Sequence, residues 1–167
     1  YKTTDGGANW VQTLVGAIQI SDMRMNTAPG STTIYAVGRT NGVFYSSADM
    51  GSTWNSLTVE AVTPGSGSRL SVSPADPGVV YINFIGSNSA TGGGIIYRSA
   101  DGGATFSLRK GNVLPNLNGY TANTSGQGNY NYDMEADPLD ANTLYVCGHL
   151  IWKSTDGGIT WVQKQAT

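Results

Sequence analysis

The sequence predicts an all-β fold built from repeated four-stranded units, and three observations support this prediction. Its 167 residues include 23 Gly and 9 Tyr but only 12% charged residues, a composition typical of short strands and tight turns. No stretch combines a helical apolar period with helix caps. Finally, one eight-residue pattern recurs four times, as TTDGGANW, SADMGSTW, SADGGATF and STDGGITW.

The recurring octapeptide places a carboxylate, a glycine-containing bend and an aromatic residue in a fixed order. Its aspartates are 44, 52 and 55 residues apart, near the period of about 40–50 residues that is typical of propeller blades. The residues that define the pattern are Asp5, Gly7 and Trp10, then Asp49, Gly51 and Trp54, then Asp101, Gly103 and Phe106, and finally Asp156, Gly158 and Trp161.

Short apolar strands surround each of the last three octapeptides, three before it and one after it. In the middle unit they start at RLSVS and continue through GVVYIN, GIIYR and TFSLRK. Four antiparallel strands per period form the blade of a β-propeller. We therefore predict a partial β-propeller with the end of one blade at 1–15, whole blades at 17–60, 68–110 and 129–165, and a long inserted loop at 111–128.

Three blades are too few to close a ring, because closed propellers usually have about four to eight. Unaided, they would leave strand edges and apolar sheet faces open to water. The expected partners are therefore the remaining blades of a longer parent chain.

The octapeptide is predicted to be a structural turn. Its carboxylate can accept hydrogen bonds from backbone N–H groups of its own turn, and its glycine permits a positive φ. The hydroxyl before the aromatic residue, replaced by Asn9 in the first copy, can close the loop, while the aromatic ring packs between adjacent sheets. One carboxylate per turn falls short of the roughly six to eight oxygens of a calcium site, so no metal and no cofactor are predicted.

Composition excludes other classes of protein. The net charge of −2 argues against a nucleic-acid partner, and no apolar run has the length of a membrane span. Cys147 is the single cysteine and cannot form an internal disulfide. It lies in the predicted strand TLYVCG, where we expect a small buried residue.

A ligand is expected on the edge opposite the octapeptides, where the loops 38–42, 61–68, 86–94, 111–131 and 147–150 should gather. Residues 111–131 form the longest of these, rich in Asn, Gly and Tyr, and loops of that length are often functional. A solvated insertion and a segment packed over a neighbouring blade are the alternatives. The candidate ligand-binding residues are Arg39, Arg69, Tyr120, Tyr130, Tyr132 and His149.

The innermost strands can be aligned on Tyr35, Tyr81 and Tyr145. This alignment puts Asp22, Arg69 and Asp133 near the ligand-side entry of those strands, where they could contact sugar or peptide, bind water or pair with one another. His149 is the only histidine and has no second soft ligand beside it, which argues against a metal site.

The four octapeptides resemble the Asp-box, or BNR repeat, of sialidases, xyloglucan-cleaving glycosidases, sortilin-type receptors and photosystem assembly factors. The resemblance implies that the octapeptides lie on the outer rim, away from the ligand. Residues 126–161 are also similar to blades of large secreted bacterial Asp-box proteins of the cell surface, which usually have Gly-Gly where this chain has Gly148-His149. That similarity implies an extracellular or cell-surface location.

The leading functional hypothesis is a non-catalytic scaffold or binding module whose ligand is a polysaccharide or a surface protein. Every repeated residue has a structural explanation, and neither Glu60 nor Glu135 lies in a recognisable nucleophile motif. The alternative is part of a glycoside hydrolase, in which Asp133, and after it Asp22, would be the candidates for acid or base. A sortilin-type peptide receptor is less favoured, because its cysteine-rich modules are not seen here.

Overall fold

The computed structural model describes residues 1–16, 19–60, 67–86, 93–128 and 130–164. Their regular structure is entirely β, in three separate four-stranded antiparallel sheets, so the predicted fold class is confirmed. Most of two predicted ligand-side loops, those at 61–68 and 86–94, lies outside the described residues. No helix in the described ranges is long and apolar enough to cross a bilayer.

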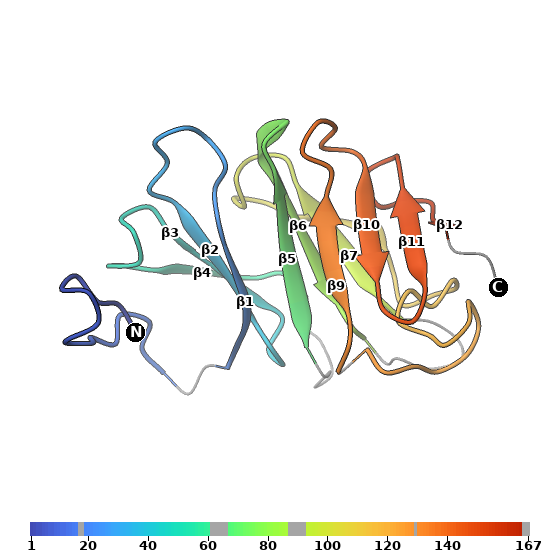
Figure 1. Ribbon diagram of the computed structural model, residues 1–167, viewed down its shortest axis with the longest axis horizontal. Coiled ribbons are helices and arrows are strands. Elements are labelled where there is room, and N and C mark those ends of the chain that lie inside the picture. The colour runs from blue at the N-terminus through green and yellow to red at the C-terminus, as the bar shows by residue number, and fades with distance from the viewer. Residues whose placement is uncertain (17–18, 61–66, 87–92, 129, 165–167) are drawn as a thin grey trace.

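Each sheet is a simple meander in which neighbouring strands are consecutive in the chain. Figure 1 shows the three sheets side by side in chain order, with β1, β5 and β9 as neighbouring innermost strands. The first sheet consists of β1 (Ile20–Met25), β2 (Ile34–Gly38), β3 (Val43–Ser47) and β4 (Asn55–Thr58). The second consists of β5 (Ser68–Ser73), β6 (Asp76–Phe84), β7 (Ile95–Ser99) and β8 (Ser107–Lys110), and the third of β9 (Asp133–Ala136), β10 (Leu144–Cys147), β11 (Ile151–Ser154) and β12 (Val162–Gln163).

Residues 1–16 contain no named strand. An isolated antiparallel bridge joins Lys2 to Val11 across the first octapeptide, with N···O distances of 2.7 and 2.9 Å. This segment therefore has the form of a single turned corner beside the first sheet.

Apolar side chains fill the two spaces between sheets, because alternate residues of a strand point to opposite faces. Tyr35 and Val37 of β2 meet Val80 and Ile82 of β6 in the first cluster. In the second cluster, Tyr81 and Ile96 of the second sheet meet Met134, Leu144, Val146 and Trp152 of the third. Leu117, from the long loop, is fully buried in this second cluster. Leu117 thus anchors the loop in the core between two blades, whereas Val113, Leu114 and Tyr120 of the same loop are exposed.

The four octapeptides form corners with the same hydrogen bonds. In the corner at 47–54, Asp49 Oδ1 accepts from the backbone N–H of Thr53 at 2.8 Å, and Asp49 Oδ2 accepts from the Thr53 hydroxyl at 2.7 Å. Ser47 donates to Asp49 Oδ1 and accepts from Gly51 N, both at 2.8 Å. The other three corners repeat these contacts, with Asn9 replacing the second hydroxyl as expected.

The hydroxyl that begins each corner was not anticipated, although the sequence shows Thr3, Ser47, Ser99 and Ser154 at these positions. It orients the carboxylate and accepts the bend N–H at the same time. Hydrogen bonds from the hydroxyl and the backbone N–H of Thr105 lower the pKa of Asp101 to about 2. The corner carboxylates therefore accept their hydrogen bonds from donors within their own turns.

The corner aromatics differ in what they touch. Phe106 packs edge-on against Phe44 of the first sheet at 4.9 Å between ring centroids, and Trp161 packs against the second core cluster. The expectation that every such ring packs between sheets is wrong for Trp10, which is 59% exposed. Its indole N–H donates to Gly7 O at 3.0 Å, and none of the three described sheets covers the ring.

Arg109 links the second sheet to the corner of the third. Its guanidinium donates to Asp156 O and Gly157 O, both at 2.9 Å. Arg98 donates to the Tyr81 hydroxyl at 3.1 Å, and that hydroxyl donates to Ala141 O at 2.7 Å. These two arginines therefore tie neighbouring blades together at the corners.

Cys147 is exposed, so the prediction of a buried residue is wrong. Strand alternation turns Val146 into the core between the second and third sheets and turns Cys147 to the opposite face of β10. Although the residue is exposed, partial desolvation raises the pKa of its thiol, and the nearby Asp133 carboxylate raises it further. The thiol therefore stays protonated near neutral pH.

Candidate functional site at the mouth edge

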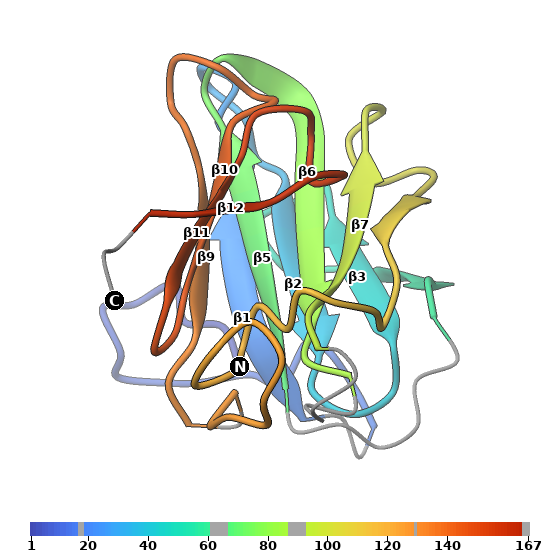
Figure 2. The ribbon, with the colours of Figure 1, turned by 90° about the vertical axis from the view of Figure 1, so that its right-hand side faces the viewer.

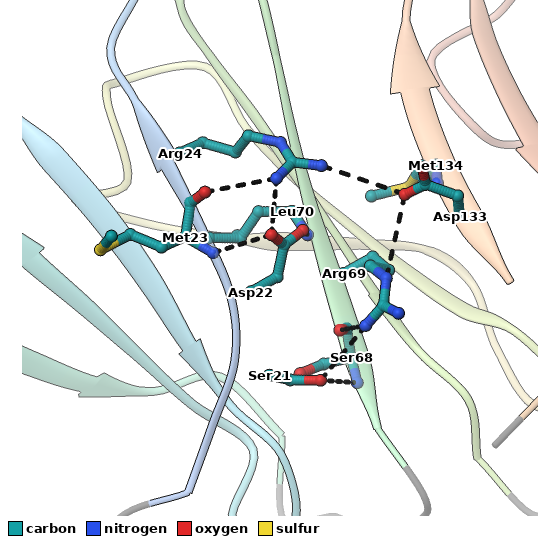
Figure 3. A network of polar contacts seen from close by, with 9 residues as sticks. All are labelled: Ser21, Asp22, Met23, Arg24, Ser68, Arg69, Leu70, Asp133 and Met134. Atoms are coloured by element: carbon teal, nitrogen blue, oxygen red, sulfur yellow. Dashed lines mark hydrogen bonds and ion pairs between the residues drawn. The ribbon is translucent and has the colours of Figure 1, made fainter. Parts of the chain in front are cut away.

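The innermost strands β1, β5 and β9 all begin at one edge of the molecule, which we call the mouth edge. Figures 1 and 2 show residues 111–128 along this same lower edge, from which β9 rises. The first residues of these strands hold polar and charged side chains from three blades close together (Figure 3). We call this group, composed of Ser21, Asp22, Arg24, Ser68, Arg69 and Asp133, the inner-strand network.

Asp22 is the most enclosed charged member of the inner-strand network, with 11% of its side chain exposed. Its Oδ1 accepts from Arg24 Nη1 at 2.6 Å and from Met23 N at 2.8 Å. Its Oδ2 reaches the next blade and accepts from Leu70 N at 2.9 Å. These contacts use the carboxylate to join β1 to β5.

Asp133 is the open member, with 67% of its side chain exposed. Figure 3 shows its carboxylate facing two guanidinium groups from different blades. Oδ1 lies 3.8 Å from Arg69 Nε and 3.9 Å from Arg24 Nη2, and it accepts from Met134 N at 2.9 Å. At such distances the arginine contacts are ion pairs without hydrogen bonds. The hydrogen bonds that Arg24 and Arg69 form with described residues use their Nη1 atoms instead.

Tyr132 lies beneath Arg69, whose guanidinium carbon is 4.5 Å from the centre of the ring. The ring is only 6% exposed, and burial raises the pKa of its hydroxyl. Arg69 also donates to Ser68 O at 3.0 Å and to Ser21 Oγ at 3.4 Å. Of the predicted ligand-binding residues, Tyr132 thus supports Arg69 from below, whereas Arg69 itself faces the open edge.

Side chains of one innermost strand bond to the backbone of the next. Asp22 Oδ2 accepts a hydrogen bond from Leu70 N, and Ser71 Oγ accepts one from Ala136 N at 2.6 Å. Ser21 Oγ likewise accepts from Ser68 N at 3.1 Å. Hydroxyl and carboxylate oxygens therefore join the innermost strands of adjacent blades.

Glu135 lies in no nucleophile motif and was therefore assigned no role from the sequence, yet it lies two residues after Asp133 on β9. Residues at this spacing share a strand face, which is the signal that could have identified it. Burial raises the pKa of Glu135, and the Asp133 and Asp22 carboxylates add to the rise while Arg24 opposes it. Arg24 was also given no role at first, yet it bridges Asp22 and Asp133.

Tyr120 and His149 meet on the long-loop side of the mouth edge, with ring centroids 4.5 Å apart. His149 Nε2 lies 3.5 Å from Gln127 Oε1, and Tyr120, His149 and Tyr130 are all exposed. Arg39 is exposed as well and follows the end of β2 at the mouth edge of the first blade, where its N–H donates to Gln19 O at 2.7 Å. The structure thus pairs Tyr120 with His149 and Tyr132 with Arg69.

A hollow of about 430 Å³ lies elsewhere, between residues 1–16 and the outer face of the first sheet. Its walls include Leu14, Ile20, Met23 and Trp54. This hollow is lined mainly by apolar side chains, and none of the charged residues of the inner-strand network is among them. Within the described ranges, no group of three or more His, Cys, Asp or Glu side chains is arranged to hold a metal ion.

Comparison with known proteins supports the fold. No protein-family model matches the chain. A xyloglucanase of a Paenibacillus species is 31% identical over 143 residues, which cover 74% of this chain and 13% of that protein. The chain thus spans about an eighth of the length of this relative.

Solved structures also support the fold. The GH74 xyloglucanase of Xanthomonas campestris matches with a TM-score of 0.60 and 21% identity, covering 92% of this chain and 22% of its own. YCF48 bound to D1 peptide matches with a TM-score of 0.56 and 20% identity. The match covers 87% of this chain and 40% of that chain. At these identities the likeness concerns the fold. The chain is a partial β-propeller, with three blades in the described residues.

Proposed function

We propose that the chain is a carbohydrate-binding part of a larger β-propeller and that it binds its ligand at the mouth edge without cleaving it. The observation that carries this proposal is the open arrangement of Asp133 between Arg24 and Arg69, at 3.9 and 3.8 Å. A carboxylate accepts two or more hydroxyl donors, and a guanidinium donates to hydroxyl and ring oxygens. A sugar diol placed there would satisfy both kinds of group.

Exposed aromatic rings on the long-loop side of the mouth edge support a sugar ligand. Tyr120, whose ring packs at a tilt against His149, and Tyr130 present rigid apolar faces on the long loop. Such faces can pack against the C–H groups of a pyranose ring at little conformational cost. We therefore assign Tyr120 and Tyr130 to the wall of the binding site.

The name of the Paenibacillus relative suggests a first ligand to test. That protein is a xyloglucanase, so xyloglucan is a reasonable candidate for this chain. The shared hydrogen bonds of the four corners support assignment to the Asp-box group, and a polysaccharide ligand agrees with the proposed secreted or cell-surface location.

The state of the carboxylates favours binding over hydrolysis. An acid–base pair in a glycosidase needs two carboxyl groups free to face the scissile bond from about 5–10 Å apart. Asp22 accepts three hydrogen bonds and is largely enclosed, so it is committed to joining two blades. The alternative, part of a glycoside hydrolase, is favoured by the named relative and by the raised pKa of Glu135 beside Asp133.

The remaining blades of the propeller are the proposed macromolecular partners. Ile20, Met23 and Met25 leave apolar area exposed on the outer face of β1, beside the hollow of about 430 Å³. Within the chain, the matching face of the second sheet is covered by β2 and β3 of the first. We propose that another blade covers the outer face of β1 in the same way.

The experiment is calorimetric titration of the chain with xyloglucan oligosaccharides, together with an assay for released reducing ends. We expect binding without hydrolysis and a loss of about 10-fold in affinity for Asp133→Asn and Arg69→Met, because each removes a charged hydrogen-bonding partner. Asp76→Asn removes the same charge from an exposed site at the opposite edge and should bind normally.

Absence of binding to xyloglucan and to other β-glucans would overturn the carbohydrate proposal. Release of reducing ends that Asp133→Asn abolishes while the fold stays intact would replace it with the hydrolase alternative. Equal affinity of Asp133→Asn and Asp76→Asn would remove the inner-strand network from the site.

A further inference from the structure

Lys110 is a buried cation at the end of β8 and has no role in the site described so far. It is 5% exposed, and burial lowers the pKa of its ammonium group to about 8. An isolated buried ammonium costs several kcal/mol, roughly, unless its N–H groups are satisfied. Something at this position must therefore compensate for the lost water.

Backbone carbonyl groups surround Lys110 Nζ, and no carboxylate of the described residues forms a salt bridge with it. Val113 O lies at 2.7 Å, Gly93 O at 3.0 Å, and Gly94 O and Gly111 O at 3.2 Å. The stretches that supply them, GGII and GNVLPNLN, contain no ionisable side chain. We call these four oxygens the carbonyl cage.

Charged groups on the neighbouring strands are engaged elsewhere. Arg109 donates to the corner of the third sheet, Arg98 to the Tyr81 hydroxyl, and the Tyr97 hydroxyl to Glu60. The ammonium of Lys110 is therefore held by peptide dipoles alone among the described residues.

The carbonyl cage joins two segments of the mouth edge. Gly93 and Gly94 precede β7, whereas Gly111 and Val113 open the long loop that carries Tyr120. Gly93 O also accepts from Leu117 N at 3.2 Å, and the buried Leu117 anchors the loop in the core. Without the ammonium, four carbonyl dipoles would converge on an empty space, which favours separation of the two segments.

We propose that Lys110 is a positioning residue: its ammonium, held in the carbonyl cage, fixes the long loop against β7 and so places Tyr120 in the binding wall. The effect on ligand affinity rests on the proposed function, whereas the effect on loop order does not. Lys110 touches no ligand and acts only through the loop.

Hydrogen exchange of the Leu117 amide, followed by NMR in the free protein, tests this role. Lys110→Ala should lower its protection at least 10-fold, while the Val80 amide in the core of β6 keeps its protection. Lys110→Met fills the space with an apolar chain and should also lose protection. If Lys110→Met is as protected as the wild type, side-chain packing explains the effect and the proposal fails.

Chemical rescue separates the cation from general structural damage. Propylammonium replaces the atoms that Lys110→Ala removes, so it should restore Leu117 protection, whereas tetramethylammonium has no N–H donor and should not. Equal action of the two ions, or of neither, would overturn the proposal. If Lys110→Met loosens the loop but binds xyloglucan oligosaccharide normally, the loop is outside the ligand site and the failure belongs to the proposed function.

Discussion

The corners and the mouth edge lie at opposite ends of the same strands, and they use charged residues in opposite ways. Each corner repeats one arrangement, in which Asp49 or its equivalent takes hydrogen bonds from within eight residues. At the mouth edge, the aligned positions of the three innermost strands hold Asp22, Arg69 and Asp133, and their contacts cross from blade to blade.

This difference separates folding from recognition. A residue that every repeat needs for the same local turn recurs in every repeat, whereas a binding surface needs different groups at equivalent places. The corner carboxylates have their hydrogen bonds filled by their own turns, while Asp133 keeps two cations beyond hydrogen-bond distance. Substitutions at the corners should therefore change stability, and substitutions at the mouth edge should change binding.

The largest expected effect is at a corner that packs against another sheet. Gly103 has a φ of +88°, and an added Cβ would lie 2.6 Å from the Phe44 ring. Gly103→Ala should lower the free energy of unfolding by about 3 kcal/mol, combining backbone strain with overpacking. Urea denaturation followed by tryptophan fluorescence measures this.

Gly6→Ala is the matched control, because Gly6 also has a positive φ of 69° but has no atom within 4 Å of the added Cβ. It should cost about 1 kcal/mol from backbone strain alone. Equal costs for the two variants would show that the corner is a purely local turn without a role in joining sheets.

Acid should weaken the corners. Hydrogen bonds lower the pKa of Asp101 to about 2 in the folded chain, below its usual value of 3.8, so the unfolded chain binds protons first. Stability from this group is complete above about pH 4 and is lost as the pH falls toward 2. Asp101→Asn should reduce stability at pH 7 and flatten the fall in urea midpoint between pH 5 and pH 2.

Asp133→Asn provides the comparison, since this side chain is exposed and forms no corner. Its urea midpoints should follow the wild type across the same pH range. A slope that changes as much for Asp133→Asn as for Asp101→Asn would contradict the division between the two edges.

The smallest expected change in the free energy of unfolding comes from the one corner that has a side chain at the bend. Met50 occupies the bend position that is Gly6, Gly102 or Gly157 elsewhere, and its φ of +57° is unfavourable for a side chain. Met50→Gly should raise the free energy of unfolding by about 0.5 kcal/mol, because relief of strain exceeds the added chain entropy of glycine. Met50→Ala keeps the backbone strain and should leave thermal stability unchanged. If Met50→Gly and Met50→Ala both stabilise the chain, removal of the methionine side chain, and not relief of backbone strain, is the cause.

The sequence predicted the repeated part of the molecule well. A period set by Asp5, Asp49, Asp101 and Asp156 and the apolar strands around it were enough to identify blades, because each blade obeys local rules of turn and alternation. Cys147 and Trp10 were misjudged because their exposure depends on which neighbouring sheet covers them, and the strand pattern alone does not specify that.

The mouth edge was predictable only in outline. Aligning the innermost strands brought Asp22, Arg69 and Asp133 to one edge, but the bridging role of Arg24 depends on distances between blades. The burial of Tyr132 under Arg69, and the carbonyl cage around Lys110, depend on how a long loop packs. These contacts join residues far apart in sequence, so they cannot be predicted from a local sequence pattern.

The side-chain oxygens that cap Leu70 N and Ala136 N also protect the inner rim against strand addition. An innermost strand would otherwise offer its free N–H groups to any extended segment, which invites aggregation and also peptide capture by β-augmentation. With these donors occupied, the binding proposed for the mouth edge would rely on side chains, which suits the proposed hydroxyl-rich ligand better than an extended polypeptide.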